Sequence, residues 1–94
     1  MGKLKVIKTL HPHIVRVEGI CGGRPIIKGT RTPVRSVAGY YKLGMSIDEL
    51  LTALPHLKLN QIFDALSYYF DNQQEIDKDL EEDSEENLMK KLDV

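Results

Sequence analysis

Apolar residues recur with a helical spacing along the middle of the chain. From Pro33 onward, three successive segments place them at positions i, i+3, i+4 and i+7, which predicts three short amphipathic helices. The positions are Val34, Val37, Ala38 and Tyr41, then Ile47, Leu50, Leu51 and Leu54, then Leu59, Ile62, Phe63 and Leu66, with Phe70 extending the last stripe. We expect the second helix over about 46–54 and the third over about 59–71.

The predicted helices have residues at their ends that favour starting or stopping a helix. Thr32 and Pro33 supply an N-cap followed by a proline at the first helical position. Gly44 is suited to end the first helix in a left-handed conformation. Ser46 and Glu49 have the spacing of a capping box at the start of the second helix.

The first third of the chain has the character of strands instead. Three short segments rich in β-branched residues lie at 4–10, 13–20 and 25–28. Gly22 and Gly23 predict a turn between the last two, so that 13–28 forms either a hairpin or an arm swapped between subunits. Pro25 cannot donate to a ladder, which places its strand at the edge of a sheet.

The segment 72–94 is polar and strongly acidic. Apolar residues recur in it at multiples of four, which predicts a thin stripe on a charged helix. An isolated helix of this kind is marginal in water, so we expect it to become ordered in the groove of a partner protein. The stripe consists of Ile76, Leu80, Leu88 and Leu92.

The two parts of the chain have opposite charge, although the 94 residues together have a formal net charge of −1. Residues 1–58 contain ten Lys/Arg and three Asp/Glu, and residues 59–94 contain three and eleven, so the two parts carry +7 and −8. This asymmetry predicts a polyanionic partner for the basic part. The alternative is that the two parts attract each other within one fold or across a dimer.

Four cations gather in and beside the stretch GGRPIIKGTRTPV, residues 22–34. Arginine suits phosphate binding because its planar fork offers paired donors. The alternative is a solvated rim, or ion pairs to the acidic part of the chain. A nucleotide-binding P-loop is excluded, because Lys28 precedes Gly29 rather than following it. The four cations are Arg24, Lys28, Arg31 and Arg35.

The second and third predicted helices, joined by the turn 55–58, have the order of a helix–turn–helix. Asn60 and Gln61 lie near the start of the third helix, away from its apolar stripe, where they could read adenine. The third helix has no Lys or Arg. Lys58 and the basic N-terminal part would therefore have to supply the phosphate contacts.

No set of residues predicts catalysis, a metal or a cofactor. His11 and His13 with Cys21 lack a fourth ligand for a tetrahedral metal site, and we expect them to be turn and core residues. Asp64 and Asp71 have no basic or histidine neighbour on their own helix. A single cysteine fits a reducing cytoplasm, and no apolar run reaches the roughly 18 residues of a membrane helix.

Three stretches in succession, GGRPIIKGTRTPV, YYKLGMSIDELL and LPHLKLNQIFDALSYYFDNQQEID, closely resemble the small prokaryotic family called domain of unknown function 433. The resemblance implies a homeodomain-type helix–turn–helix behind a β-arm. It also implies an antitoxin of a type II toxin–antitoxin pair, beside a PIN-like ribonuclease. Members usually have Thr where this chain has Lys58. Because lysine cannot accept amide hydrogen bonds, we expect Asn60 to cap the third helix and start it later.

We therefore expect a mainly α fold, with a three-helix homeodomain-like core, a short N-terminal β-arm or hairpin and an acidic helical tail. The expected divisions are 1–32 for the arm and basic connector, 33–71 for the core and 72–94 for the tail. We expect the N-terminal strands to pair between the subunits of a homodimer. Truncation after Asn72 is expected to abolish toxin neutralisation and to leave a folded domain.

The expected function is that of a cytoplasmic antitoxin, not an enzyme, that binds its own operator DNA and a PIN-like ribonuclease toxin. The alternative is a dimeric interaction or scaffold module that does not bind DNA. The expected DNA contacts are Arg24, Lys28, Arg31, Arg35, Lys58, Asn60 and Gln61, and the expected toxin contacts are Ile76, Leu80, Leu88 and Leu92.

Overall fold

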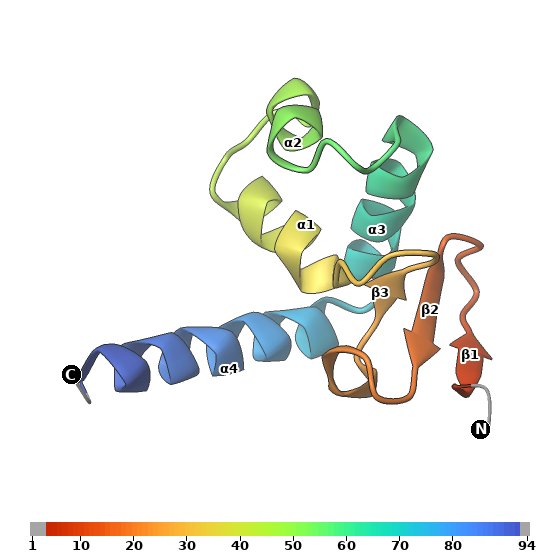
Figure 1. Cartoon of the computed structure of the whole chain (residues 1–94). Coiled ribbons are helices and arrows are strands. Elements are labelled where there is room, and N and C mark those ends of the chain that lie inside the picture. The colour runs from red at the N-terminus through yellow and green to blue at the C-terminus, as the bar shows by residue number, and fades with distance from the viewer. Residues whose placement is uncertain (1–3, 93–94) are drawn as a thin grey trace.

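The computed structural model describes residues 4–92, and the side chains of residues 4–82. The fold is a small mixed α/β domain with four α-helices and a three-stranded antiparallel sheet in this part of the chain (Figure 1). Its elements are β1 (Val6–Lys8), β2 (Ile14–Val17), the 3-10 turn η1 (Cys21–Gly23), β3 (Ile26–Ile27), α1 (Val34–Lys42), α2 (Ile47–Ala53), α3 (Leu59–Asp71) and α4 (Gln73–Leu92).

The sheet has the strand order β1-β2-β3, and both neighbours of β2 run antiparallel to it. The hairpin expected over 13–28 is present, with η1 between its strands. Pro25 comes directly before the edge strand β3, as its missing N–H requires. The pairing that we expected between subunits is made within one chain for all three strands, β1 with β2 and β2 with β3.

Helix α1 ends as the sequence predicted, but it begins with a different N-cap. Pro33, not Thr32, is the N-cap, because Pro33 is extended and the N–H of Val34 finds the carbonyl of Pro25 at 3.0 Å. At the other end Gly44 has φ of 93°. Its N–H donates to the carbonyl of Tyr41 at 3.0 Å, so the predicted left-handed termination is confirmed.

The start of α2 is confirmed and the start of α3 is not. Ser46 and Glu49 make both bonds of the capping box, at 3.2 and 3.0 Å. Helix α3 begins at Leu59 with Lys58 as its N-cap, so the later start at Asn60 is wrong. The side-chain oxygen of Gln61, in the first turn of α3, accepts a hydrogen bond from the N–H of Lys58 at 2.7 Å. A free N–H at the start of the helix therefore has a partner.

The core face of α3 is rotated from the predicted stripe. Leu59, Phe63 and Phe70 are about half exposed, whereas Tyr68 and Tyr69 are buried. The two tyrosines can be buried because their hydroxyl groups donate to carboxylates of α4, each at 2.9 Å. The buried core draws on the sheet and all four helices, through Ile14, Ile27, Val34, Val37, Leu50, Ile62, Ala65 and Ile76 among others.

Helix α4 is joined to the domain at its start and then runs outward beneath α1 (Figure 1). Ile76 is fully buried in the core, and Leu80 packs against that core. These two residues were expected to bind a partner, and in this structure they contact their own domain instead. Leu88 and Leu92 lie outside the described side chains. Within the described part, no helix is long and apolar enough to cross a membrane.

Candidate functional site

A short contact joins the loop after β3 to the turn between α2 and α3. Thr32 Oγ1 lies 2.6 Å from His56 Nε2. Lys28 and Arg31 are exposed on the loop, and Lys58 is exposed at the end of the turn. We call Lys28, Arg31 and Lys58 the basic rim. The sequence predicted each of these cations as a DNA contact, and the Thr32–His56 contact brings their two segments together.

The loop that carries Lys28 and Arg31 is held in one shape by its own backbone. The Thr30 hydroxyl donates to the carbonyl of Ile27 at 2.8 Å and accepts the N–H of Thr32 at 3.0 Å. Gly29 has φ of 81°, a conformation in which a side chain would be strained. The basic rim is therefore mounted on a defined turn rather than on a linker without internal bonds.

The other two cations of this stretch are directed at α4. Arg24 pairs with Asp79 at 3.6 Å and with Glu82 at 2.9 Å. Burial raises the pKa of Asp79, while the charges of Arg24 and Arg35 act in the opposite direction. Both arginines therefore face an almost buried carboxyl group of the acidic helix. Here the structure supports the alternative in which the basic and acidic parts attract each other.

Further ion pairs join the basic and acidic parts. Lys42 pairs with Asp77 at 2.9 Å, and Arg16 pairs with Glu75. The hydrogen bond from Lys42 lowers the pKa of Asp77. Together with those of Arg24, these contacts fasten the first half of α4 to the sheet and α1.

The start of α3 offers fewer polar groups than the sequence suggested. Gln61 is occupied by its bond to the backbone of Lys58. Asn60 is exposed in the first turn. Three apolar residues of α3 are about half exposed, Leu59, Phe63 and Phe70, and we call them the outward strip.

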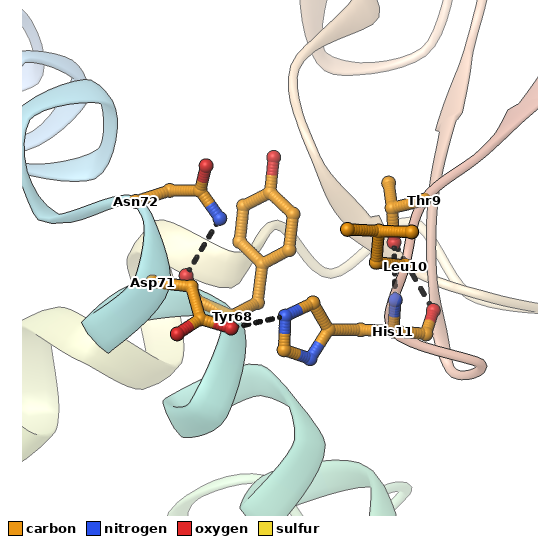
Figure 2. A pocket seen from close by; sticks show the side chains of 6 residues that line it. All are labelled: Thr9, Leu10, His11, Tyr68, Asp71 and Asn72. Atoms are coloured by element: carbon orange, nitrogen blue, oxygen red, sulfur yellow. Dashed lines mark hydrogen bonds and ion pairs between the residues drawn. The ribbon is translucent and has the colours of Figure 1, made fainter.

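A cluster that the sequence did not reveal lies between the β1–β2 turn and α3 (Figure 2). His11 Nδ1 is 3.2 Å from Asp64 Oδ1, and His11 Nε2 is 2.9 Å from Asp71 Oδ2. The backbone N–H of His13 donates to the other oxygen of Asp64 at 2.7 Å. Tyr68 presents its ring edge-on to His11, with ring centroids 5.3 Å apart. His11 was expected to be only a turn residue.

This cluster fastens the β1–β2 turn to α3. Both ring nitrogens of His11 lie within hydrogen-bonding distance of carboxylates of α3. Burial, followed by the hydrogen bond to Glu75, raises the pKa of Tyr68. A hollow of about 400 Å³ lies beside His11, Tyr68 and Asp71. Among the described residues, no group of three or more His, Cys, Asp or Glu could hold a metal ion.

Comparison with known proteins places the chain in a family. The family model described as "Protein of unknown function (DUF433)" matches residues 14–69. The chain belongs to the DUF433 family. The crystal structure of a DUF433 member from Anabaena variabilis ATCC 29413 is 34% identical and has a TM-score of 0.67. The match covers 71% of this chain and 66% of that chain. No curated protein matches.

The DUF433 match contains the basic rim and the Thr32–His56 contact, but it does not contain every feature of the structure. Strand β1, His11 and helix α4 all lie outside residues 14–69. The anchoring of α3 by His11 and the ion pairs of α4 therefore depend on residues outside the matched segment.

Proposed function

We propose that this DUF433 protein is a DNA-binding antitoxin, in which the basic rim and the start of α3 contact operator DNA. The basic rim carries the proposal. Lys28 and Arg31 are exposed on the loop after β3, Lys58 is exposed as the N-cap of α3, and the two segments are joined by the Thr32–His56 contact. Exposed cations around a helix N-terminus favour phosphate, because the helix dipole adds positive potential there.

The order of α2, turn and α3 is compatible with a helix–turn–helix, in which the second helix approaches the major groove. Asn60 in the first turn is the side chain that would read a base, since an amide can bond adenine in a bidentate manner. Arg24 is not assigned to DNA, because it already pairs with two carboxylates. We therefore expect about three phosphate contacts per chain, which gives a moderate dependence on salt.

We assign neutralisation of a PIN-like ribonuclease to the outer part of α4. The outer part of this helix extends past α1 (Figure 1), and the described surface of the helix includes Glu81, which is exposed. A ribonuclease must bind a polyanion, so its active face is expected to be basic and complementary to an acidic helix. Because Ile76 anchors the start of α4, the helix can be presented to a partner without first having to fold.

The DNA proposal is tested by the salt dependence of binding to the DNA upstream of the protein's own gene, measured by fluorescence anisotropy. Arg31→Ala should reduce the slope of log K against log salt by about one. Two controls are matched in charge: Lys78→Ala, exposed on α4, and Arg24→Ala should leave the slope unchanged. Absence of binding even at low salt, or an equal effect of all three changes, would contradict the proposal.

The neutralisation proposal is tested with the small ribonuclease encoded next to this gene, by the cleavage of a labelled RNA. Glu81→Lys should weaken inhibition because it reverses a charge on the exposed side of α4. Lys78→Glu adds a negative charge on the same helix and should not weaken inhibition. If both variants inhibit as well as the unchanged protein, α4 is not the contact surface.

The outward strip of α3 favours a second candidate function, that of a protein-interaction module without DNA binding. Leu59, Phe63 and Phe70 are about half exposed, and Tyr41 meets Phe70 edge-on at 5.6 Å. No Lys or Arg lies on α3. If Phe63→Asp abolishes ribonuclease binding and the unchanged protein does not bind upstream DNA, this function replaces the first.

A further inference from the structure

Strand β1 forms one edge of the sheet and is exposed along its whole length (Figure 1). Leu4, Val6 and Ile7 are 56%, 55% and 48% exposed, and Leu10 just beyond the strand is fully exposed. An edge strand with exposed apolar side chains is a template for pairing with another strand. Such a concentration of apolar surface on a small domain marks an interaction site.

The backbone of β1 has one free row of donors and acceptors. The N–H of Glu18 donates to the carbonyl of Lys5 at 3.0 Å, and Ile7 lies opposite Arg16. Because hydrogen-bonded positions alternate along an antiparallel pair, Lys5 and Ile7 direct their backbone groups at β2. Val6 and Lys8 direct theirs away from the sheet, toward the open edge.

We propose that two copies of the chain pair β1 with β1 in antiparallel orientation, with Ile7 opposite Ile7 of the second copy on a twofold axis. In this register the outward-facing backbone groups of Val6 meet those of Lys8 of the second copy. Side chains then match as well, since Leu4 lies opposite Leu10 and Lys5 opposite Thr9. No lysine faces another lysine.

The neighbouring registers fit less well. Outward-facing backbone groups belong to every second residue of β1. They therefore stay opposite each other only if each residue's partner moves by two residues along the second strand. A shift in one direction places Val6 on the axis, puts Lys8 opposite Leu4 and leaves Leu10 beyond the paired segment. A shift in the other direction places Lys8 opposite Lys8, and such a like-charge pair is destabilising. The strand is therefore complementary to itself in one register, which favours a second copy over an unrelated strand.

Pairing would also extend an existing apolar face. Val6 lies opposite Val17 and Lys8 opposite Val15, so they share the face that carries the buried cluster of Val15, Val17 and Ile26. The apolar side chains of Leu4, Val6 and Leu10 from both copies would continue this face across a six-stranded sheet. Because the contact is confined to short strands, we expect an interface at the small end of specific ones and a concentration-dependent dimer.

Disulfide cross-linking tests the register directly. In a Cys21→Ser background, Ile7→Cys would place two thiols in a non-hydrogen-bonded pair with Cα atoms about 4.5 Å apart, within the range of a disulfide. Under mild oxidation this variant should form a covalent dimer on a non-reducing gel. In this register Val6 lies opposite Lys8 of the second copy, two positions away from the second copy's own residue 6. The control Val6→Cys should therefore cross-link far less. Cross-linking of Val6→Cys instead, or of neither variant, overturns the proposal.

Sedimentation velocity tests the interface without a new cysteine. The unchanged protein should shift from the monomer to twice the monomer mass as its concentration rises. Ile7→Lys would place two lysines against each other on the axis and should remain monomeric. Leu43→Lys, at a residue 79% exposed at the end of α1 and outside the sheet, should dimerise normally. A chain that stays monomeric up to on the order of 1 mM, or an Ile7→Lys variant that still dimerises, overturns the proposal.

Discussion

The Nδ1 atom of His11 lies 3.2 Å from a carboxylate oxygen of Asp64, a residue 53 positions further along the chain. The other ring nitrogen, Nε2, lies 2.9 Å from a carboxylate oxygen of Asp71, which is about two helical turns after Asp64 on α3. One side chain in the β1–β2 turn therefore holds two carboxyl groups of a helix. This contact covers one flank of α3 and leaves its other flank as the outward strip.

We expect His11→Ala to loosen the β1–β2 turn from α3, because both carboxyl groups lose a partner. The free energy of unfolding measured in urea should fall by about 1–3 kcal/mol, and amide exchange over residues 9–13 should become faster. His13→Ala is the matched control, since its contact to Asp64 is made by the backbone N–H and is kept. Equal stability of the two variants would show that the imidazole does not anchor the turn.

The second prediction concerns the role of α4 in stability. Ile76→Ala removes a fully buried side chain and should reduce the free energy of unfolding by about 2–4 kcal/mol. Truncation after Asn72 should destabilise the domain at least as much, contrary to the expectation from sequence. Leu43→Ala, at an exposed residue, should change the stability by less than about 0.5 kcal/mol. A stable truncated domain would mean that the other three helices and the sheet suffice.

The third prediction is a dependence on pH at the Lys42–Asp77 pair. The hydrogen bond from Lys42 lowers the pKa of Asp77 from its ordinary 3.8. A carboxyl group with a lowered pKa stabilises the fold fully above its ordinary pKa and loses this effect as the pH falls. Asp77→Asn should therefore lower the Tm by a few degrees at most at about pH 7, because the pair is half exposed.

The difference in Tm between Asp77→Asn and the unchanged protein should shrink toward zero as the pH falls to about 2. Glu81→Gln, at an exposed position of the same helix, serves as the control for the loss of one negative charge. A difference that persists unchanged at low pH would assign the effect to packing instead of charge.

The fourth prediction concerns the capping box of α2. Ser46→Ala removes the acceptor for the N–H of Glu49 and should reduce the free energy of unfolding by about 1 kcal/mol. Thr52→Ala is the control, because the Thr52 hydroxyl only bonds back to the carbonyl of Asp48 within the exposed helix. Thermal unfolding followed by circular dichroism can distinguish the two, and equal Tm values would contradict the assignment.

The parts of the fold that were predicted from sequence are those set by nearby residues. Ser46 and Glu49 are three positions apart, and Gly44 terminates α1 through its own backbone angle. Their positions in the chain therefore sufficed to predict the end of α1 and the start of α2. The exceptions are the start of α1, where Pro33 and not Thr32 is the N-cap, and the start of α3, where the cap comes from Gln61 and not from the side chain of Lys58.

The parts that sequence did not predict depend on which distant segments meet. The face of α3 that becomes buried depends on α1, which packs against it, and on the β1–β2 turn and α4, which contact Tyr68 and Tyr69. The helical period alone therefore assigned Leu59, Phe63 and Phe70 to the core wrongly. The acidic segment looked too polar to pack, yet Ile76 enters the core. Composition could show that Arg24 needed an anionic partner, but only the fold shows that the partner is Asp79.

The ionic strength of a buffer acts on two sets of charges in this molecule, the exposed cations of the basic rim and the ion pairs of α4. In the proposed DNA complex, dissolved salt would compete with Lys28, Arg31 and Lys58 for phosphate, and it also screens the attraction of Arg24 and Lys42 for α4. A rise in ionic strength would therefore weaken the proposed DNA contact and the ion pairs of the acidic helix at the same time. A partner that binds the outer part of this helix would then find the helix least tightly held under the conditions that weaken the proposed DNA contact.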